Sequence, residues 1–88
     1  MRESREDVQE IRDRLREFVR RELLGNPNYP LRDDEPLITG GLIDSFALAQ
    51  VGVFIEQAFG VYLADTDLTA ANMDTVERMA SCVLSGRR

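Results

Sequence analysis

The sequence predicts an all-α fold, a small antiparallel bundle of three long helices and one short helix with a long first loop. Apolar residues recur at three- and four-residue spacing in three separate segments, which is the pattern of amphipathic helices. Prolines and glycines gather between these segments, where loops are expected. The 88 residues, 43% of them hydrophobic, suffice for one domain with one modest core. We therefore expect a single domain over residues 1–88, with a frayed tail at 84–88.

The first helix is predicted from Ser4 to Leu24. Ser4 and Asp7 resemble an imperfect capping box at its start. Gly25 favours the left-handed conformation that ends many helices, and Pro27 stops the helix from continuing. The apolar side chains of this segment form one stripe, which we expect to be buried: Val8, Ile11, Leu15, Phe18, Val19 and Leu23.

Residues 25–43 are predicted to form a long irregular loop. Three prolines, an acidic run at Asp33–Glu35 and the Gly40–Gly41 pair all resist regular structure. The acidic run lacks the pattern of a calcium-binding loop, and we interpret it as a solvated turn rather than a cation site. The loop is too apolar for a disordered linker, so we expect it to lie across the helices, fixed by its apolar side chains: Tyr29, Leu31, Leu37, Ile38, Leu42 and Ile43.

The second helix is predicted from Ser45 to Phe59, with Gly60 ending it. A glycine inside this helix, Gly52, costs about 1 kcal/mol relative to alanine, and we expect it to mark close packing or space for an inserted group. One face is expected in the core: Leu48, Val51, Gly52, Ile55 and Phe59. Another face is mixed and more apolar than solvation requires: Phe46, Ala49, Gln50, Val53 and Gln57.

The remaining chain contains a short apolar bridge at 61–63, a short helix within 65–72 and a last helix from Thr75 to Leu84. We expect Asp65 or Thr66 to cap the short helix, and Asp74 with Glu77 to form a capping box for the last one. The last helix is expected to bury Val76, Met79, Ala80 and Val83, and to hold Cys82 half-buried at the core edge.

Composition argues against an enzyme. All eleven basic residues are arginine, so the chain has neither a histidine nor a lysine to serve as a general base or Schiff-base amine. One cysteine excludes an internal disulfide and a thiolate metal cluster. We find no phosphate-binding glycine motif and no carboxylate pair set by spacing. The composition therefore predicts that the protein is not an enzyme and holds no metal.

Charge is distributed unevenly along the chain. The formal net charge is −5, and residues 33–77 contain nine acids and no base. This segment disfavours nucleic acid, whose phosphates require cations, and favours partners that present arginine or lysine. The alternative is an acidic surface kept for solubility. The charged first residues and the lack of a long apolar run predict a cytoplasmic protein, without a membrane span, that we expect to be monomeric.

The most informative stretch is Gly40-Gly41-Leu42-Ile43-Asp44-Ser45-Phe46, a junction between the loop and the second helix. An Asp-Ser pair at such a junction is, taken alone, most simply explained as a helix cap. The hydroxyl of Ser45 could instead be exposed as an attachment point, since the N-terminus of a helix favours an attached anion.

The arrangement around this junction resembles the acyl carrier and peptidyl carrier protein family. An amphipathic helix and a long fixed loop precede Gly-Leu-Ile-Asp-Ser-Phe, and Phe-Gly-Val, a short acidic segment and Asp-Thr-Val follow it. The resemblance covers nearly the whole chain and is most specific from Leu37 to Val76. It implies that a phosphopantetheinyl transferase attaches 4′-phosphopantetheine from coenzyme A to Ser45, and that the arm carries acyl or aminoacyl groups as thioesters.

The resemblance also implies partners and a docking surface. An adenylating ligase would load the arm, and downstream acyl-transfer or synthase enzymes would unload it. Asp44 would contribute to transferase recognition. The second helix would be the main docking element, through its mixed face and its acidic flanks: Phe46, Ala49, Val53, Asp44, Asp65 and Asp67. Fatty-acid carriers usually line this helix with acids, whereas here it contains a single acid, Glu56. The Gly-Leu-Ile-Asp-Ser-Phe pattern instead looks closer to D-alanyl and other aminoacyl carriers, or to carriers loaded by stand-alone adenylating ligases.

A helical adaptor that binds partners without modification is the alternative from another class. It shares the predicted fold, and it differs only in whether Ser45 is exposed and accepts the prosthetic group. A nucleic-acid-binding bundle is a distant third interpretation, which the acidic middle of the chain disfavours.

Overall fold

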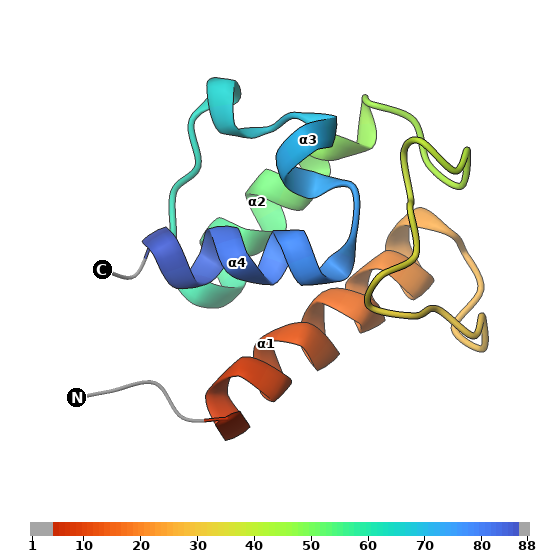
Figure 1. Ribbon diagram of the computed structural model, residues 1–88, viewed down its shortest axis with the longest axis horizontal. Helices are drawn as coiled ribbons and strands as arrows, with labels where there is room; N and C mark the ends of the chain where they lie inside the picture. Colours follow the sequence, from red (N-terminus) through yellow and green to blue (C-terminus); the bar gives the residue numbers. More distant parts are fainter. Residues whose placement is uncertain (1–4, 87–88) are drawn as a thin grey trace.

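The computed structural model describes residues 5–86, and its regular elements are all helical (Figure 1). They are, in chain order, α1 (Arg5–Phe18), the π-helical turn η1 (Val19–Leu23), α2 (Ala47–Phe59), the 3₁₀ turn η2 (Asp65–Asp67), α3 (Ala70–Met73) and α4 (Val76–Gly86). No strand is present in the described residues, which confirms the all-α prediction. The capping box expected at Ser4 lies outside them. None of the helices within 5–86 has the length and apolar character needed to cross a membrane.

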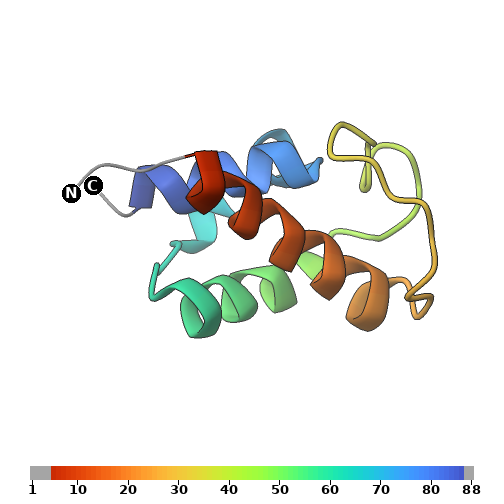
Figure 2. The ribbon, with the colours of Figure 1, turned by 90° about the horizontal axis from the view of Figure 1, so that it is seen from below.

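The long helices run in two directions. α1 packs against α4, and both α2 and α4 run opposite to α1 in two perpendicular views (Figures 1 and 2). Because α2 and α4 point the same way, the chain must return from the end of α2 to the start of α4. The return segment contains η2 and α3, which lie on the far side of α2 and α4 from α1 in Figure 1.

One hydrophobic core joins the helices and the long loop. Leu15 and Val19 of the first helix, Ile55 of α2 and Met79 of α4 are completely buried. Leu37 of the loop is also completely buried, so the loop contributes to the core as predicted. The remaining buried hydrophobic residues are Ile11, Leu31, Ile43, Ala47, Leu48, Val51, Val61, Met73, Val76, Ala80 and Val83.

The first helix ends where the sequence predicts, but its last turn is wider than an α-helical one. The N–H of Leu24 donates to the carbonyl of Val19 at 2.8 Å, a five-residue step that defines a π turn. Gly25 then adopts φ of +66°, the left-handed conformation expected of it. The ring of Phe18 stacks on Phe54 of α2 with centroids 4.3 Å apart, which fixes this end of the helix against α2.

The capping predictions for the later helices are wrong. The expected short helix is divided into η2 and α3, and the hydroxyl of Thr69, rather than Asp65 or Thr66, caps α3 by accepting from Asn72. Thr75 caps α4, since its hydroxyl accepts from the N–H of Arg78 at 3.0 Å. Asp74 does not take part, because its carboxylate is turned towards the loop.

The end of the chain also differs from the expectation. α4 continues to Gly86, two residues beyond the predicted end at Leu84, so residues 84–86 are helical rather than part of a tail. Its buried residues are the four predicted ones.

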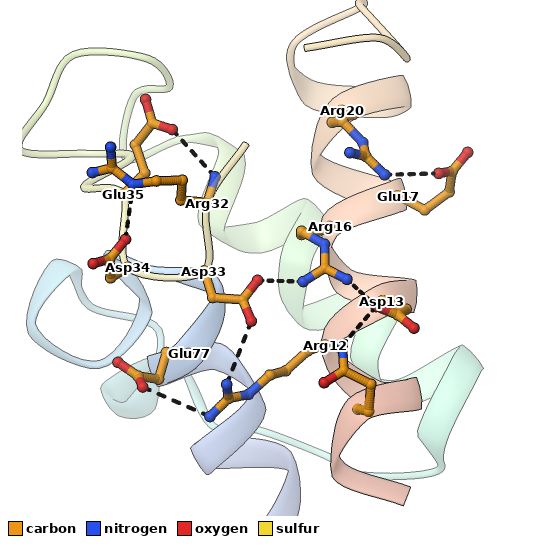
Figure 3. A network of polar contacts seen from close by, with 11 residues as sticks. Arg12, Asp13, Arg16, Glu17, Arg20, Arg32, Asp33, Asp34, Glu35 and Glu77 are labelled. Carbon is orange, nitrogen blue, oxygen red and sulfur yellow. Dashed lines mark hydrogen bonds and ion pairs between the residues drawn. The ribbon is translucent and has the colours of Figure 1, made fainter. Parts of the chain in front are cut away.

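The acidic run of the loop is not the solvated turn that was predicted. Asp33 forms ion pairs with Arg12, at 3.4 Å, and with Arg16, both on α1 (Figure 3). Arg12 also reaches Glu77 of α4 at 3.7 Å. Only Asp34 remains largely exposed, paired with its neighbour Arg32. The N–H of Glu77 donates to the carbonyl of Asp33 at 3.0 Å, so Asp33 joins the loop to both α1 and α4. The sequence pattern does not reveal this role, because the arginines lie about twenty residues away.

Candidate functional site

The candidate site is the turn that joins the long loop to α2. The carboxylate of Asp44 accepts a hydrogen bond from the N–H of Phe46 at 3.1 Å. The carbonyls of Asp44 and Ser45 accept from Ala47 and Leu48 at 3.1 and 3.2 Å, which starts the helix. α2 thus begins at Ala47, two residues later than predicted. Asp44 accepts the hydrogen bond from the Phe46 N–H because its short side chain can reach the amide two residues further along the chain.

Ser45 is exposed and its side chain has no structural task in this turn. Within residues 5–86, no hydrogen bond involves its hydroxyl. No histidine or lysine is present in the chain to activate it. The hydroxyl is therefore accessible from solvent and is not held by any residue of the described part of the chain. The structure thus favours the exposed-hydroxyl interpretation over capping by Ser45.

The face of α2 next to Ser45 is apolar and open to solvent. Phe46 is 85% exposed and Val53 is 54% exposed, and Ala49 lies between them, also exposed. The opposite face is the buried one, with Val51 and Ile55 completely inaccessible. The division of α2 into a core face and a mixed exposed face is confirmed.

The acids expected to flank this face do not all gather around Ser45. Asp44 is at the turn itself, whereas Asp65 and Asp67 lie in η2, on the segment that follows α2. That segment crosses the middle of α2, because a side chain added at Gly52 would meet Leu68 at 3.0 Å. Gly52 is therefore explained by close packing. Asp67 is partly committed to its own turn, where it accepts from the N–H of Ala64 at 3.3 Å.

The end of the first helix also borders the site, which the sequence did not indicate. A shallow hollow of about 390 Å³ lies beside the turn, between η1 and the start of α2. Glu22 and Leu23 form one side of it, and Asp44, Phe46 and Gln50 form the other. Glu22 and Asp44 make it acidic, in keeping with a partner that presents basic side chains. No spacing rule connects Glu22 with Asp44, since only the folded chain brings both to the same hollow.

Cys82, the one cysteine, is half-buried on α4 as expected. Burial, with a smaller contribution from the negative charge of Asp67, raises the pKa of its thiol. Its sulfur lies 3.7 Å from the carbonyl oxygen of Asn72. Its thiol is therefore less readily ionised at neutral pH than a free cysteine.

No protein-family model, no curated protein and no solved structure matches this chain.

Proposed function

We propose that the protein is an acyl or aminoacyl carrier and that Ser45 carries 4′-phosphopantetheine. A phosphopantetheinyl transferase would transfer the group from coenzyme A. An adenylating ligase would load the thiol of the arm, and downstream enzymes would take the cargo from it. We further propose that the helices form the antiparallel bundle of that family. The observation that carries the proposal is the exposed Ser45 hydroxyl, which forms no hydrogen bond within residues 5–86, while Asp44 accepts the hydrogen bond from the neighbouring Phe46 N–H.

The local electrostatics suit an attached phosphodiester. The positive end of the α2 dipole lies next to Ser45 and favours a nearby anion by roughly 0.3–1 kcal/mol. The N–H groups of Phe46 and Ala47 are already engaged by Asp44. The phosphodiester would therefore be held by the field of the helix rather than by direct bonds to these two amides. This arrangement leaves the arm free to leave the surface, as a tethered carrier requires.

The exposed apolar face supports docking by contact rather than by charge alone. Phe46, Ala49 and Val53 offer apolar area beside the attachment point, and Asp44 provides the adjacent negative charge. Partners would be steered by the acids and retained by burial of the apolar side chains. No chemistry is asked of the carrier itself, which agrees with the composition.

Mass spectrometry tests the proposal directly. The wild-type protein, incubated with coenzyme A, Mg²⁺ and a transferase of broad specificity, should gain one phosphopantetheine. Ser45→Ala should gain none, whereas Ser81→Ala, at an exposed serine of α4, should be modified like the wild type. A wild-type protein left unmodified by several such transferases would contradict the proposal.

That outcome would favour the second candidate, an unmodified adaptor. The observation in its favour is the same exposed apolar surface, since large apolar side chains in water often mark a binding site. The adaptor needs Phe46 and Val53 but has no use for the hydroxyl of Ser45.

A further inference from the structure

A buried carboxylate between α3 and α4, that of Asp74, holds the loop that leads to Ser45. Asp74 is 7% exposed. One of its oxygens accepts from the N–H groups of Ile38 and Thr39 at 2.8 and 3.0 Å, and the other accepts from the hydroxyl of Thr39 at 2.6 Å. The carbonyl of Asp74 also accepts from the N–H of Leu37 at 2.7 Å. Asp74 thus binds three consecutive loop residues through four hydrogen bonds.

The same three residues form the base of a closed lobe, residues 37–43. The carbonyl of Leu37 accepts from the N–H groups of both Leu42 and Ile43, at 2.9 and 3.0 Å. The lobe is tight, because a side chain at Gly40 would lie 2.2 Å from the carbonyl oxygen of Pro36. Ile43, the last residue of the lobe, is buried and directly precedes Asp44.

The turn with Ser45 is therefore fixed from two sides. Hydrogen bonds from Ala47 and Leu48 join it to α2, as described above, and on the other side it continues from the lobe. Asp44 and Ser45 are exposed, so no burial of their own side chains determines where the turn lies. The position of the lobe, and hence the contacts of Asp74, supplies the constraint on the loop side of the turn.

We infer that Asp74 is a positioning residue for the modification of Ser45, acting through the 37–43 lobe to present the Asp44–Ser45 turn in the orientation that a transferase recognises. The inference rests on the proposed function. Asp74 touches neither the hydroxyl nor any reacting atom. Its contribution is to reduce the number of turn conformations from which a productive complex must be selected.

Kinetics of modification separate this role from a purely structural one. The variants are Asp74→Asn, which removes the charge and one acceptor, and Thr39→Val, which removes only the hydroxyl donor. Asp34→Asn, at an exposed acid of the same loop, is the control. The assay uses the full chain, coenzyme A, Mg²⁺ and the transferase that modifies the wild type. It is run where circular dichroism shows each variant to be folded.

For Asp74→Asn, the KM of the transferase for the carrier should rise on the order of tenfold, as expected from loss of a charge-assisted hydrogen bond, with kcat nearly unchanged. Thr39→Val should show a smaller rise, and Asp34→Asn none. Amide hydrogen exchange at Leu42 and Ile43 should accelerate in Asp74→Asn. This readout does not depend on modification.

The outcomes distinguish the two proposals. If the wild type is not modified, both the proposed function and this inference are wrong. If it is modified and the folded Asp74→Asn keeps the wild-type KM, only the inference is overturned. Should Asp74→Asn fail to fold, Thr39→Val decides the question, and a wild-type KM for that variant rejects the positioning role.

Discussion

Two acidic residues fasten the long loop to the helices, and they do so by different physical means. Asp33 pairs with Arg12 and Arg16 of α1, and these three side chains are between 19% and 30% exposed. Asp74 reaches the loop from its place between α3 and α4, is 7% exposed and binds backbone N–H groups and one hydroxyl. The first attachment joins flexible side chains near water. The second joins a buried charge to fixed backbone donors.

The contacts of Asp74 should determine the loop conformation more strongly than the ion pairs of Asp33. An ion pair between long side chains in partial contact with water is weak, because solvent screens it and ordering the side chains costs entropy. A carboxylate held by backbone donors loses little entropy, and its removal leaves those donors without a partner. We therefore expect the Asp74 attachment to define the geometry near Ser45. The Asp33 attachment should keep the more distant part of the loop close to α1.

The largest effect should come from removing the buried carboxylate. Asp74→Ala leaves the N–H groups of Ile38 and Thr39 without their acceptor, and should lower the free energy of unfolding by roughly 2–3 kcal/mol. Chemical denaturation followed by circular dichroism measures it. If Asp74→Ala lowered the free energy of unfolding by no more than Asp33→Asn does, the two attachments would be equally strong and the distinction between them would be wrong.

The pH dependence of stability shows how much of the Asp74 contribution to the free energy of unfolding depends on its negative charge. Burial alone would raise the pKa of its carboxyl group, but the hydrogen bonds from Thr39 and Ile38, with the nearby positive charge of Arg78, hold that pKa below its usual value. The extra stability is therefore complete above the unfolded-state pKa of about 3.9 and is lost as the pH falls through the lower folded-state value. The stability difference between wild type and Asp74→Asn should be constant from pH 7 to about pH 5 and shrink below about pH 4.

A smaller and salt-sensitive effect should follow from Asp33→Asn. The change removes the ion pairs to Arg12 and Arg16 but leaves the side-chain shape, and should cost about 1 kcal/mol or less at low salt. Added NaCl at 0.5 M should reduce the difference, because screening weakens partly exposed pairs, whereas the Asp74→Ala loss should hardly change. Asp34→Asn is the matched control. If salt reduced the stability losses of Asp33→Asn and Asp74→Ala equally, burial would not distinguish the two attachments.

The buried faces of the helices and the loop anchors can be predicted from the sequence alone. Helical spacing located the three long helices, and the stripe with Leu15 and Val19 is buried as predicted, because local periodicity reports which face meets the core. The apolar character of the loop residues predicts that they anchor the loop. Residues such as Leu37 have no other way to leave water.

The partners of the charged side chains could not be predicted in this way. Asp74 fits the pattern of a helix cap, and Asp33 that of a solvated turn, because each pattern considers only nearby residues. Their actual partners are 35 or more positions away for Asp74 and 17 to 21 for Asp33. The Asp-Ser pattern likewise leaves open whether Ser45 is exposed. In the structure Ser45 is exposed, and Asp44 accepts the hydrogen bond from the Phe46 N–H.

The smallest effect should come from Ser45→Ala, at the exposed end of the loop that neither attachment holds directly. Because its hydroxyl accepts and donates no hydrogen bond among residues 5–86, the change should alter the free energy of unfolding by less than about 0.5 kcal/mol. Asp44→Ala, which removes the acceptor of the Phe46 N–H, should cost about 1 kcal/mol. The two variants, measured side by side by chemical denaturation, show which of the two side chains stabilises the turn. If Ser45→Ala were the more damaging, its hydroxyl would be a structural group, and the turn would have no hydroxyl to spare for a prosthetic arm.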